Sequence, residues 1–264
     1  MCRLLVYFGK NIYLNEIIYD PEHSIIKQSY SSAYTPNIKK NVLNSDLNLD
    51  GFGCGWWVPE KKNFFVYKSL KPIWNDTILN SIANSIKSNL IFAHIRAVLR
   101  KRSSPVSDLN THPFIANGWI WMHNGCIIDF DKHKGNITSH IEPCILPYLY
   151  GSTDSEFCFG LYLTFLAKNK NPLESFTFLF KYLKKNNFNG YYNFITSDGI
   201  NILCSRFVIG LNKEPLSLYF DNDKKVISSE PLYPNSKWIV IPKNSILHYK
   251  ENNYHIYDLS KIIF

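Results

Sequence analysis

The amino-acid sequence predicts an α+β fold in which strands dominate both ends of the chain and helices lie mainly in the middle. Apolar runs of strand length occur before residue 96 and again from residue 191 onward, and the strongest helical periodicity falls between residues 154 and 185. This order is typical of helices layered against sheets. The 264 residues suit one large domain or two small ones. Because no repeat or linker divides them, we expect a single domain over residues 1–264.

The beginning of the chain predicts short strands and one long loop. Residues 3–8 form an apolar run that ends at Gly9. Residues 19–50 carry turn signals and little periodicity, so we expect an irregular loop there. In the segment from Asp50 to Val58, which has the apolar pattern of a strand, three glycines alternate with other residues, which implies close backbone approach or a bulge. Residues 64–67 are expected to pair with this strand as a hairpin.

Helices are predicted where apolar residues recur every three or four positions, over residues 76–88, 154–168 and 173–185. Asn75 or Asp76 is expected to cap the first helix, and the sequence Thr153-Asp154-Ser155-Glu156 matches a capping box for the second. The inward faces of these two helices are predicted to consist of Ile78, Leu79, Ile82 and Ile86, and of Phe157, Leu161 and Phe165.

The remaining strands are predicted from short apolar or alternating runs. One covers residues 90–95, and another covers residues 119–123 and is expected to break at Asn124-Gly125, a common turn sequence. The end of the chain is almost entirely strand, with predicted segments at residues 191–196, 200–207, 216–220, 226–228, 238–241, 245–249 and 254–257.

Composition narrows the class of protein. The net charge of +8 comes from scattered lysines, and Arg100-Lys101-Arg102 is the one tight basic cluster. Since basic residues are not interleaved with aromatics, we expect no nucleic-acid partner. The six cysteines form no Cys-x-x-Cys pair and no Cys/His pattern typical of zinc, so we expect reduced thiols and no metal. Without a signal peptide or an apolar run of membrane length, the sequence predicts a cytoplasmic protein without membrane contact.

Cys2, directly behind Met1, is the first candidate for chemistry. If Met1 is removed, a thiol and a free α-amine lie on the same residue, so a nucleophile carries its own general base. An α-amine has a pKa of about 7.7–8.0, close to the range in which proton transfer is efficient at neutral pH.

Four further segments have both a structural and a functional interpretation. Arg96, at the end of a predicted strand, suits a structural ion pair or a bidentate carboxylate clamp. Asn124-Gly125 suits either an ordinary turn or a pair of donors to an oxyanion. Asp154 suits either an acidic residue in the first turn of a helix or a carboxylate that binds an ammonium group. His112, in a polar loop, more often has a structural role.

Taken together and in order, these motifs resemble the class II glutamine amidotransferases, which are N-terminal nucleophile hydrolases. The stand-alone branch is the most similar; it includes an amidohydrolase of ergothioneine synthesis and a glutaminase-like subunit of a glutathione-degrading complex. The resemblance implies a four-layer αββα sandwich. Its motifs are Cys2-Arg3-Leu4-Leu5, Asp50-Gly51-Phe52-Gly53-Cys54-Gly55-Trp56, His94-Ile95-Arg96, Thr111-His112-Pro113-Phe114, His123-Asn124-Gly125 and Gly151-Ser152-Thr153-Asp154-Ser155-Glu156, followed by Asn193, Asp198-Gly199, Arg206 and Ser229-Glu230-Pro231-Leu232.

The resemblance also implies a role for each candidate residue. Cys2 would be the nucleophile after removal of Met1, Arg96 would bind the substrate α-carboxylate, and Asp154 would bind its α-amino group. Asn124 and Gly125 would form the oxyanion hole, and His112 would line the pocket near the carboxylate end. The substrate would be a small γ-glutamyl compound, and no cofactor is needed. The residues after Arg96, Ala97-Val98-Leu99-Arg100, depart from the family pattern, which leaves the leaving-group side open.

Three functions remain open at this point. The first is hydrolysis of a γ-glutamyl compound; the second is a glutaminase that passes ammonia to a separate synthetase. In the second case the acceptor is expected to be a partner protein, because the chain ends near the end of the amidohydrolase region. The third is a catalytically silent binding subunit, which retention of Met1 would favour. Cys54 is expected to pack in the core rather than act at the site.

Overall fold

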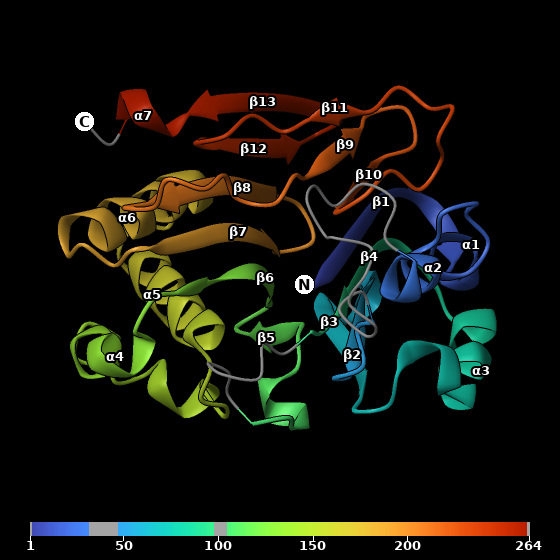
Figure 1. Cartoon of the computed structure of the whole chain (residues 1–264), viewed down its shortest axis with the longest axis horizontal. Coiled ribbons are helices and arrows are strands. Elements are labelled where there is room, and N and C mark those ends of the chain that lie inside the picture. The colour runs from blue at the N-terminus through green and yellow to red at the C-terminus, as the bar shows by residue number, and fades with distance from the viewer. Residues whose placement is uncertain (1, 32–46, 98–104, 263–264) are drawn as a thin grey trace. The chain divides into compact units, whose positions relative to one another are not determined.

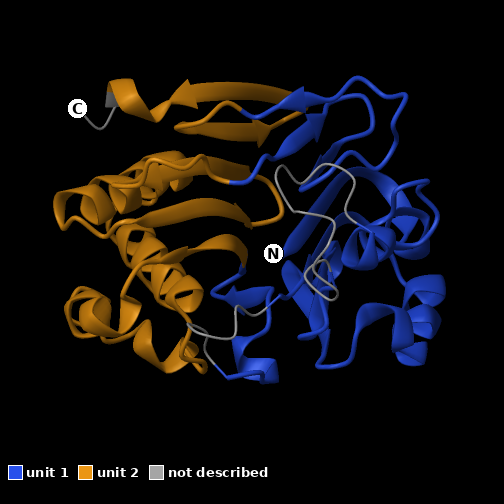
Figure 2. Ribbon diagram, in the orientation of Figure 1, with its two compact units in different colours: residues 1–120, 216–241 blue, residues 121–215, 242–264 orange. Residues whose placement is uncertain are grey.

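The computed structural model describes residues 2–31, 47–97 and 105–262 (Figure 1). The chain divides into two compact units, of residues 1–120 with 216–241 and of residues 121–215 with 242–264 (Figure 2). The single domain expected over residues 1–264 stays a prediction, since a division into compact units does not decide whether they fold as one. Within the described ranges, no helix combines the length and apolar character needed to cross a membrane.

The first unit is built on an antiparallel sheet with strand order β11-β9-β10-β1-β4-β2-β3. Its strands are β1 (Arg3–Tyr13), β2 (Phe52–Val58), β3 (Asn63–Ser69), β4 (Lys87–Ile95), β9 (Tyr219–Asp221), β10 (Val226–Ser228) and β11 (Ile239–Val240). The short strand β5 (Phe114–Ala116) belongs to the other sheet. Its helices are α1 (Asn15–Ile18), α2 (Ile25–Tyr30) and α3 (Thr77–Ser85), with short 3₁₀ turns at Pro59–Lys61, Ile73–Asn75 and Asp108–Asn110.

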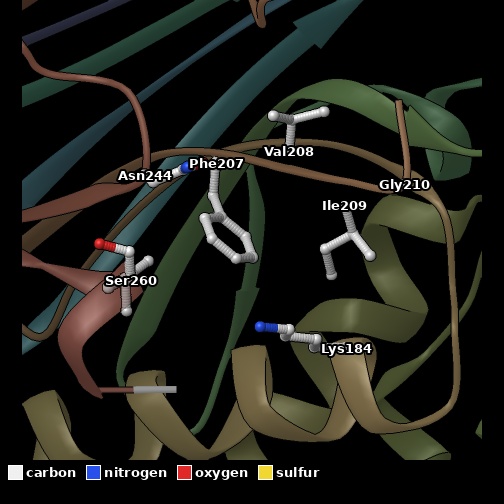
Figure 3. A pocket seen from close by; sticks show the side chains of 8 residues that line it. Lys184, Phe207, Val208, Ile209, Gly210, Asn244 and Ser260 are labelled. Carbon is white, nitrogen blue, oxygen red and sulfur yellow. The ribbon is translucent and has the colours of Figure 1, made fainter. Parts of the chain in front are cut away.

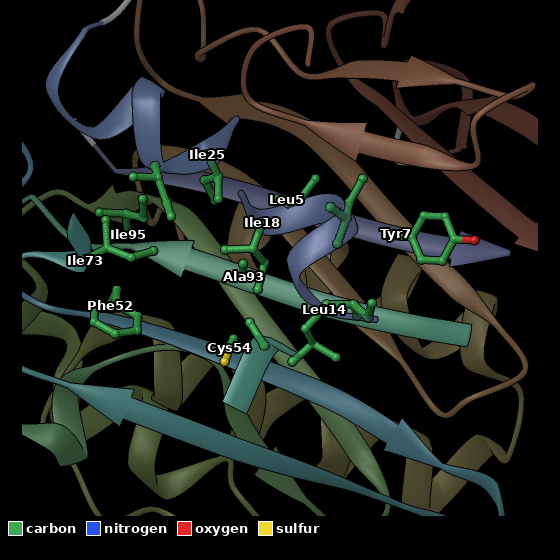
Figure 4. Close-up of a cluster of buried hydrophobic side chains, with 14 of the residues drawn as sticks. Leu5, Tyr7, Leu14, Ile18, Ile25, Phe52, Cys54, Ile73, Ala93 and Ile95 are labelled. Atoms are coloured by element: carbon green, nitrogen blue, oxygen red, sulfur yellow. The ribbon is translucent and has the colours of Figure 1, made fainter. Parts of the chain in front are cut away.

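Helices α1, α2 and α3 cover one face of this sheet. Because successive side chains of a strand point to opposite faces, every second residue of a strand faces these helices. Alternate residues of the central strands, such as Leu5, Ala93 and Cys54, point into a shared core with side chains of the three helices (Figure 4). Each large aliphatic side chain buried in this way contributes about 1.5–3 kcal/mol. Burial raises the pKa of the Cys54 thiol to about 12. The expectation that Cys54 packs in the core is therefore confirmed.

The register of the central strands brings distant parts of the chain to one end of the sheet. Arg3 of β1 lies opposite Ile95 of β4, and Ile95 also lies opposite Phe52 of β2. The residues just beyond these pairs are therefore neighbours. One consequence is that the backbone N–H of Arg96 donates to the carbonyl oxygen of Gly51 at 2.9 Å.

The second unit is an antiparallel sheet packed with helices. Its strands are β6 (Trp119–Ile127, which starts in the first unit), β7 (Gly190–Ser197), β8 (Ile202–Ile209), β12 (Ser245–Lys250) and β13 (Asn253–Asp258), in the order β13-β12-β8-β7-β6. Its helices are α4 (Phe130–Ser139), α5 (Asp154–Asn169), α6 (Pro172–Lys185) and α7 (Leu259–Ile262), with a 3₁₀ turn at Leu146–Tyr148.

Among the described helices of this unit, α5 is the most deeply buried. Residues 155–164 are buried all round the helix, and α6 lies beside it (Figure 1). Trp121 of β6 stacks on Phe159 and Tyr162 of α5, with ring centroids 5.5 and 5.7 Å apart. Since a helix with apolar residues on every side must be enclosed, α5 forms the centre of the unit.

The structure confirms most predicted elements and corrects several. Strand β1 continues past Gly9 to Tyr13. The loop expected over residues 19–50 contains helix α2, although residues 32–46 lie outside the described part of the chain. Strand β6 runs straight through Asn124-Gly125, so the turn predicted there is wrong. The neighbouring strand β7 supplies the reason, because pairing along β6 stabilises extended backbone that local turn preference would bend.

The helix predictions also need two corrections. Helix α3 is capped by Asp76 as expected, but Ile78 is 55 % exposed, and Leu79 and Ala83 are its buried residues. Helix α4 was not predicted, because its ten residues contain a single buried apolar residue, Ile137, and so show no amphipathic period. The basic cluster of residues 100–102 lies outside the described residues.

Two glycines of the second unit, Gly125 and Gly135, should respond oppositely to alanine. A Cβ at Gly125 in β6 would collide with the carbonyl oxygen of Tyr191, whereas a Cβ at Gly135 in α4 would meet open space. We expect Gly125→Ala to lower the free energy of unfolding by about 1–3 kcal/mol or more, and Gly135→Ala to raise it by about 0.5–1 kcal/mol. Urea denaturation followed by circular dichroism measures both, and an equal effect of the two substitutions would contradict the placement of β6.

Candidate active site

Cys2 lies one residue before β1 and is half-buried. The backbone N–H of Ala97 donates to its Sγ at 3.4 Å, and its thiol faces the carbonyl oxygen of Ala97 at 3.7 Å. On the other side, Nη1 of Arg3 donates to the carbonyl oxygen of Cys2 at 3.2 Å. The predicted nucleophile is thus held on both sides by groups of the first unit, as a terminal residue must be if it is to be ordered.

Arg96 precedes Ala97 and is buried, with 6 % of its surface exposed. Its Nη1 donates to the carbonyl oxygen of Pro105 at 3.2 Å, an oxygen that also accepts from the side chain of Asn110 at 3.0 Å. Burial lowers the pKa of the guanidinium, and the nearby Cys2 and Asp50 act in the opposite direction. Since a guanidinium stays protonated in proteins, Arg96 is a fixed positive charge beside Cys2.

His112 is buried in the same unit and lies over strand β2. Its ring packs on those of His94 and Phe114, with centroids 4.3 and 4.5 Å away. A Cβ at Gly53 would collide with the carbonyl oxygen of His112, and one at Gly55 would meet Pro113. This confirms the prediction that the alternating glycines mark close backbone approach.

Asn124, Gly125 and Asp154 belong to the second unit, where the structure brings them together. Asn124 is buried in β6, and Asp154 is the first residue of α5. Oδ2 of Asp154 accepts from the backbone N–H of Ile127 at 2.7 Å, and Oδ1 accepts from that of Ser155 at 2.8 Å. The carboxylate is therefore fastened to the strand that carries Asn124 and Gly125.

The capping box predicted for α5 is present in part. The side chain of Thr153 accepts from the backbone N–H of Glu156 at 3.2 Å. The carboxylate of Glu156 accepts from the backbone N–H groups of Tyr150 and Gly151, at 2.9 and 2.7 Å. These bonds satisfy groups that precede the helix and set the point at which Asp154 begins it.

Sequence reasoning missed the role of His123 and Ser155 behind this group. Nε2 of His123 lies 2.9 Å from the carbonyl oxygen of Tyr191, and Nδ1 lies 2.8 Å from Oγ of Ser155. Since a carbonyl only accepts, we infer that Nε2 carries the proton and that the Ser155 hydroxyl donates to Nδ1. Burial lowers the pKa of His123, which keeps the ring neutral. Only the position of His123 beside Asn124 could have signalled this contact in advance.

The predicted residues therefore form two groups, Cys2 with Arg96 and His112 in the first unit, and Asn124 with Gly125 and Asp154 in the second. Among the described residues, no three His, Cys, Asp or Glu side chains gather as a metal site would require.

A cavity of about 200 Å³ in the second unit is lined by residues that include Lys184, Phe207 and Ile209 (Figure 3). None of the predicted site residues lines it.

Comparisons with known proteins address the family directly. The sequence profile of the class II glutamine amidotransferases matches residues 37–215. The probable glutamine amidotransferase DUG3 of Saccharomyces cerevisiae is 29 % identical over 301 residues, which cover 95 % of this chain and 82 % of that protein. A gamma-glutamyl-hercynylcysteine sulfoxide hydrolase of Mycobacterium tuberculosis is 29 % identical over 130 residues, which cover 48 % of this chain and 50 % of that protein.

Solved structures show the same fold. A class II glutamine aminotransferase domain protein from Silicibacter pomeroyi has a TM-score of 0.70 and 21 % identity, over 98 % of this chain and 99 % of that one. The glutamine phosphoribosylpyrophosphate amidotransferase of B. subtilis has a TM-score of 0.64 and 13 % identity, over 98 % of this chain and 49 % of that one. The fold predicted from the sequence, an α+β fold of the type found in class II glutamine amidotransferases, is confirmed.

The neutral, buried His123 makes the stability of the protein depend on pH. In the unfolded chain histidine binds a proton near pH 6.5, whereas burial lowers the pKa of His123 in the folded state. The unfolded state then binds more protons below about pH 6.5, so the free energy of unfolding should fall as the pH drops from 7 to 5. Burial lowers the pKa of His248 as well, which adds a contribution of the same sign.

We expect His123→Gln to have a shallower dependence of the urea midpoint on pH than the unaltered protein over that range. The exposed His140 of the same unit provides the control, and His140→Gln should keep the original slope. An unchanged slope in His123→Gln would contradict the neutral, buried state assigned to His123.

Proposed function

The chain belongs to the class II glutamine amidotransferases, and we propose that Cys2, freed by removal of Met1, hydrolyses a γ-glutamyl amide through a γ-glutamyl thioester. The observation that carries the proposal is the placement of the Cys2 thiol, 3.4 Å from the backbone N–H of Ala97 and next to the buried Arg96. The backbone donor fixes the direction of the thiol before a substrate arrives, which is the kind of placement that an attacking group needs.

The α-amine of Cys2 serves as the general base. It accepts the thiol proton, and the sulfur attacks the γ-carbonyl carbon of the substrate. The tetrahedral intermediate collapses as the protonated amine returns its proton to the leaving nitrogen, which departs as an amine or as ammonia. A water molecule then attacks the thioester, releases glutamate and restores the thiol.

The substrate head is recognised by its two charges. Arg96 binds the α-carboxylate, for which a guanidinium provides two parallel N–H donors. Asp154 binds the α-ammonium group, and its fastening to Ile127 and Ser155 supports this role because it orients the carboxylate before substrate arrives. His112 lines the carboxylate end. Because binding the unreacting head helps to orient the γ-carbonyl, losing either contact should slow the reaction as well as weaken binding.

Asn124 and Gly125 are the proposed oxyanion donors, through the side-chain amide of Asn124 and the backbone N–H of Gly125. Each donor of this kind contributes about 3–4 kcal/mol to stabilising the transition state. The location of both residues within strand β6 supports the role, because a paired strand holds a donor more rigidly than a turn does.

The leaving group separates two versions of the function. We propose a hydrolase of γ-glutamyl compounds, supported by the hydrolase named among the relatives. In the other version the enzyme hydrolyses glutamine and passes ammonia to a separate protein, which the glutamine amidotransferase among the relatives favours. Either way the substrate is a small molecule. We further propose a cytoplasmic location, supported by the buried Cys54, Cys158 and Cys204, which form no disulfide.

Replacing the proposed nucleophile provides the central test. We expect Cys2→Ala to lower glutamate release by about 10³-fold or more, because an essential nucleophile cannot be replaced by its neighbours. The exposed Cys144 provides the matched control, and Cys144→Ala should keep full activity. Intact mass should show that Met1 has been removed from the active protein. Full activity of Cys2→Ala would refute the mechanism, and retained Met1 with no turnover would identify a silent subunit.

The same assay, run on glutamine and on a panel of γ-glutamyl peptides, decides the leaving group. Turnover of at least one γ-glutamyl peptide faster than glutamine supports the hydrolase. Turnover of glutamine alone supports the ammonia donor and replaces the hydrolase version of the proposal.

The carboxylate clamp makes a separate prediction. We expect Arg96→Lys to lower kcat/KM by about 10- to 100-fold, because a charge-assisted hydrogen bond contributes about 1.5–3 kcal/mol and lysine cannot bind a carboxylate in bidentate fashion. Arg206→Lys is the matched control, since Arg206 is similarly buried but pairs with Glu214 at 3.0 Å in the second unit. The clamp assignment is wrong if the two substitutions lower kcat/KM equally.

A further inference from the structure

A buried ion pair lies directly behind the first residues of the chain. Nη2 of Arg3 and Oε1 of Glu230 are 3.1 Å apart, and the two side chains are only 4 % and 3 % exposed. Removing two charges from water costs about as much as their attraction returns, so such a pair is weak evidence of a contribution to stability. A contribution to stability therefore does not by itself explain why the ion pair of Arg3 and Glu230 is buried here.

Glu230 is held from its second side by His23. Nε2 of His23 lies 2.7 Å from Oε2 of Glu230, so each carboxylate oxygen has its own partner. The side-chain amide of Gln28 also donates to the backbone oxygens of His23 and Glu230, at 3.1 and 3.3 Å. The carboxylate is thus held by His23, while Gln28 of α2 holds the backbone of both residues.

The other arm of Arg3 reaches the predicted nucleophile. While Nη2 faces Glu230, Nη1 donates to the carbonyl oxygen of Cys2 at 3.2 Å. Ser229 makes two hydrogen bonds with Leu4, the residue after Arg3. The side chain of Ser229 accepts from the N–H of Leu4 at 2.9 Å, and its own N–H donates to the carbonyl oxygen of Leu4 at 3.0 Å. Residues 229 and 230 therefore hold residues 2–4 from one side.

We propose that Glu230 is a positioning residue for the nucleophile, acting through Arg3 and steadied by His23. The bond from Arg3 fixes the plane of the peptide that carries Cα of Cys2, and the contacts of Sγ with Ala97 fix the rotations that remain. Together they set the direction of both the thiol and the α-amine. Glu230 touches no reacting atom. The inference rests on the proposed function, in which Cys2 is the nucleophile.

The test compares two single variants, their double variant and one control on the full chain with Met1 removed. Glu230→Gln keeps the shape of the side chain but loses its charge, and Arg3→Lys keeps the charge but cannot reach both partners. We expect each to lower kcat by about 10- to 100-fold with KM changed less than about threefold, since a displacement of about 1 Å in a reacting group can cost 10²-fold. The rate at which iodoacetamide alkylates Cys2, measured by mass spectrometry, should fall in parallel.

Coupling between the two residues gives the sharpest readout. If Glu230 acts through Arg3, the double variant should lose no more kcat than the more severe single variant. Asp76→Asn is the control, because Asp76 is a buried carboxylate of the same unit that caps α3 and accepts from Tyr67. It should lower the thermal midpoint without changing kcat or the alkylation rate.

Three results would overturn the inference. The first is an unchanged kcat and alkylation rate in Glu230→Gln. The second is a loss of kcat in Asp76→Asn equal to that in Glu230→Gln at a similar loss of stability, and the third is fully additive losses of kcat in the double variant. Failure of the proposed function is distinguishable, because it appears in Cys2→Ala as retained glutamate release whatever Glu230 does.

Discussion

The position of β1 in the middle of its sheet is the constraint on which the first unit depends. The strand begins at the third residue of the chain, yet it pairs with β4 on one side and β10 on the other. A chain end placed at a sheet edge would fray, whereas here two neighbouring strands fix it in register. One shift of register would turn Leu5 and Tyr7 away from the helices and move Cys2 away from Ala97 and Arg96. The hydrophobic core and the predicted nucleophile therefore depend on the same pairing.

Buried polar contacts complete what the strand pairing begins. Strand register determines which residues are neighbours, but it does not fix the direction of a side chain. A reacting group must be held within about 0.5 Å of its productive position, and this needs further contacts. In the first unit, Arg3 and Ser229 act on the backbone of residues 2–4, and Ala97 acts on the thiol of Cys2. In the second unit, Ile127 and Ser155 orient Asp154 in the same manner. In each unit, backbone groups next to a predicted site residue provide part of the fixation.

The sequence predicted the elements wherever the local pattern and the tertiary environment agree. The strands around residues 52–58 and 90–95 and helices α5 and α6 have clear periodicity, and each lies where expected. Prediction failed where long-range pairing decides the outcome. Asn124-Gly125 has the composition of a turn but lies in a strand, and α4 has no apolar stripe but forms a helix. The six site residues were first singled out by residue type and position, and a family resemblance supplied their roles. Their neighbours His123, Ser155 and Glu230 could be assigned contacts only once strands distant in sequence had been brought together.

The wide separation of these contacts along the chain has a physical reason. Antiparallel pairing brings to one sheet end residues that are far apart in sequence, and the carbonyl and N–H groups beyond the last pair are then available to hold side chains. Arg96 bonds to Gly51, and Ala97 contacts Cys2, because all lie just beyond the pairs that Ile95 makes with Arg3 and Phe52. Residues just beyond the last pairs of neighbouring strands are close enough for their side chains and backbone groups to make direct contact. A nucleophile at the start of a central strand therefore gains partners from the strands on both sides, β4 through Ala97 and β10 through the Ser229 and Glu230 that follow it.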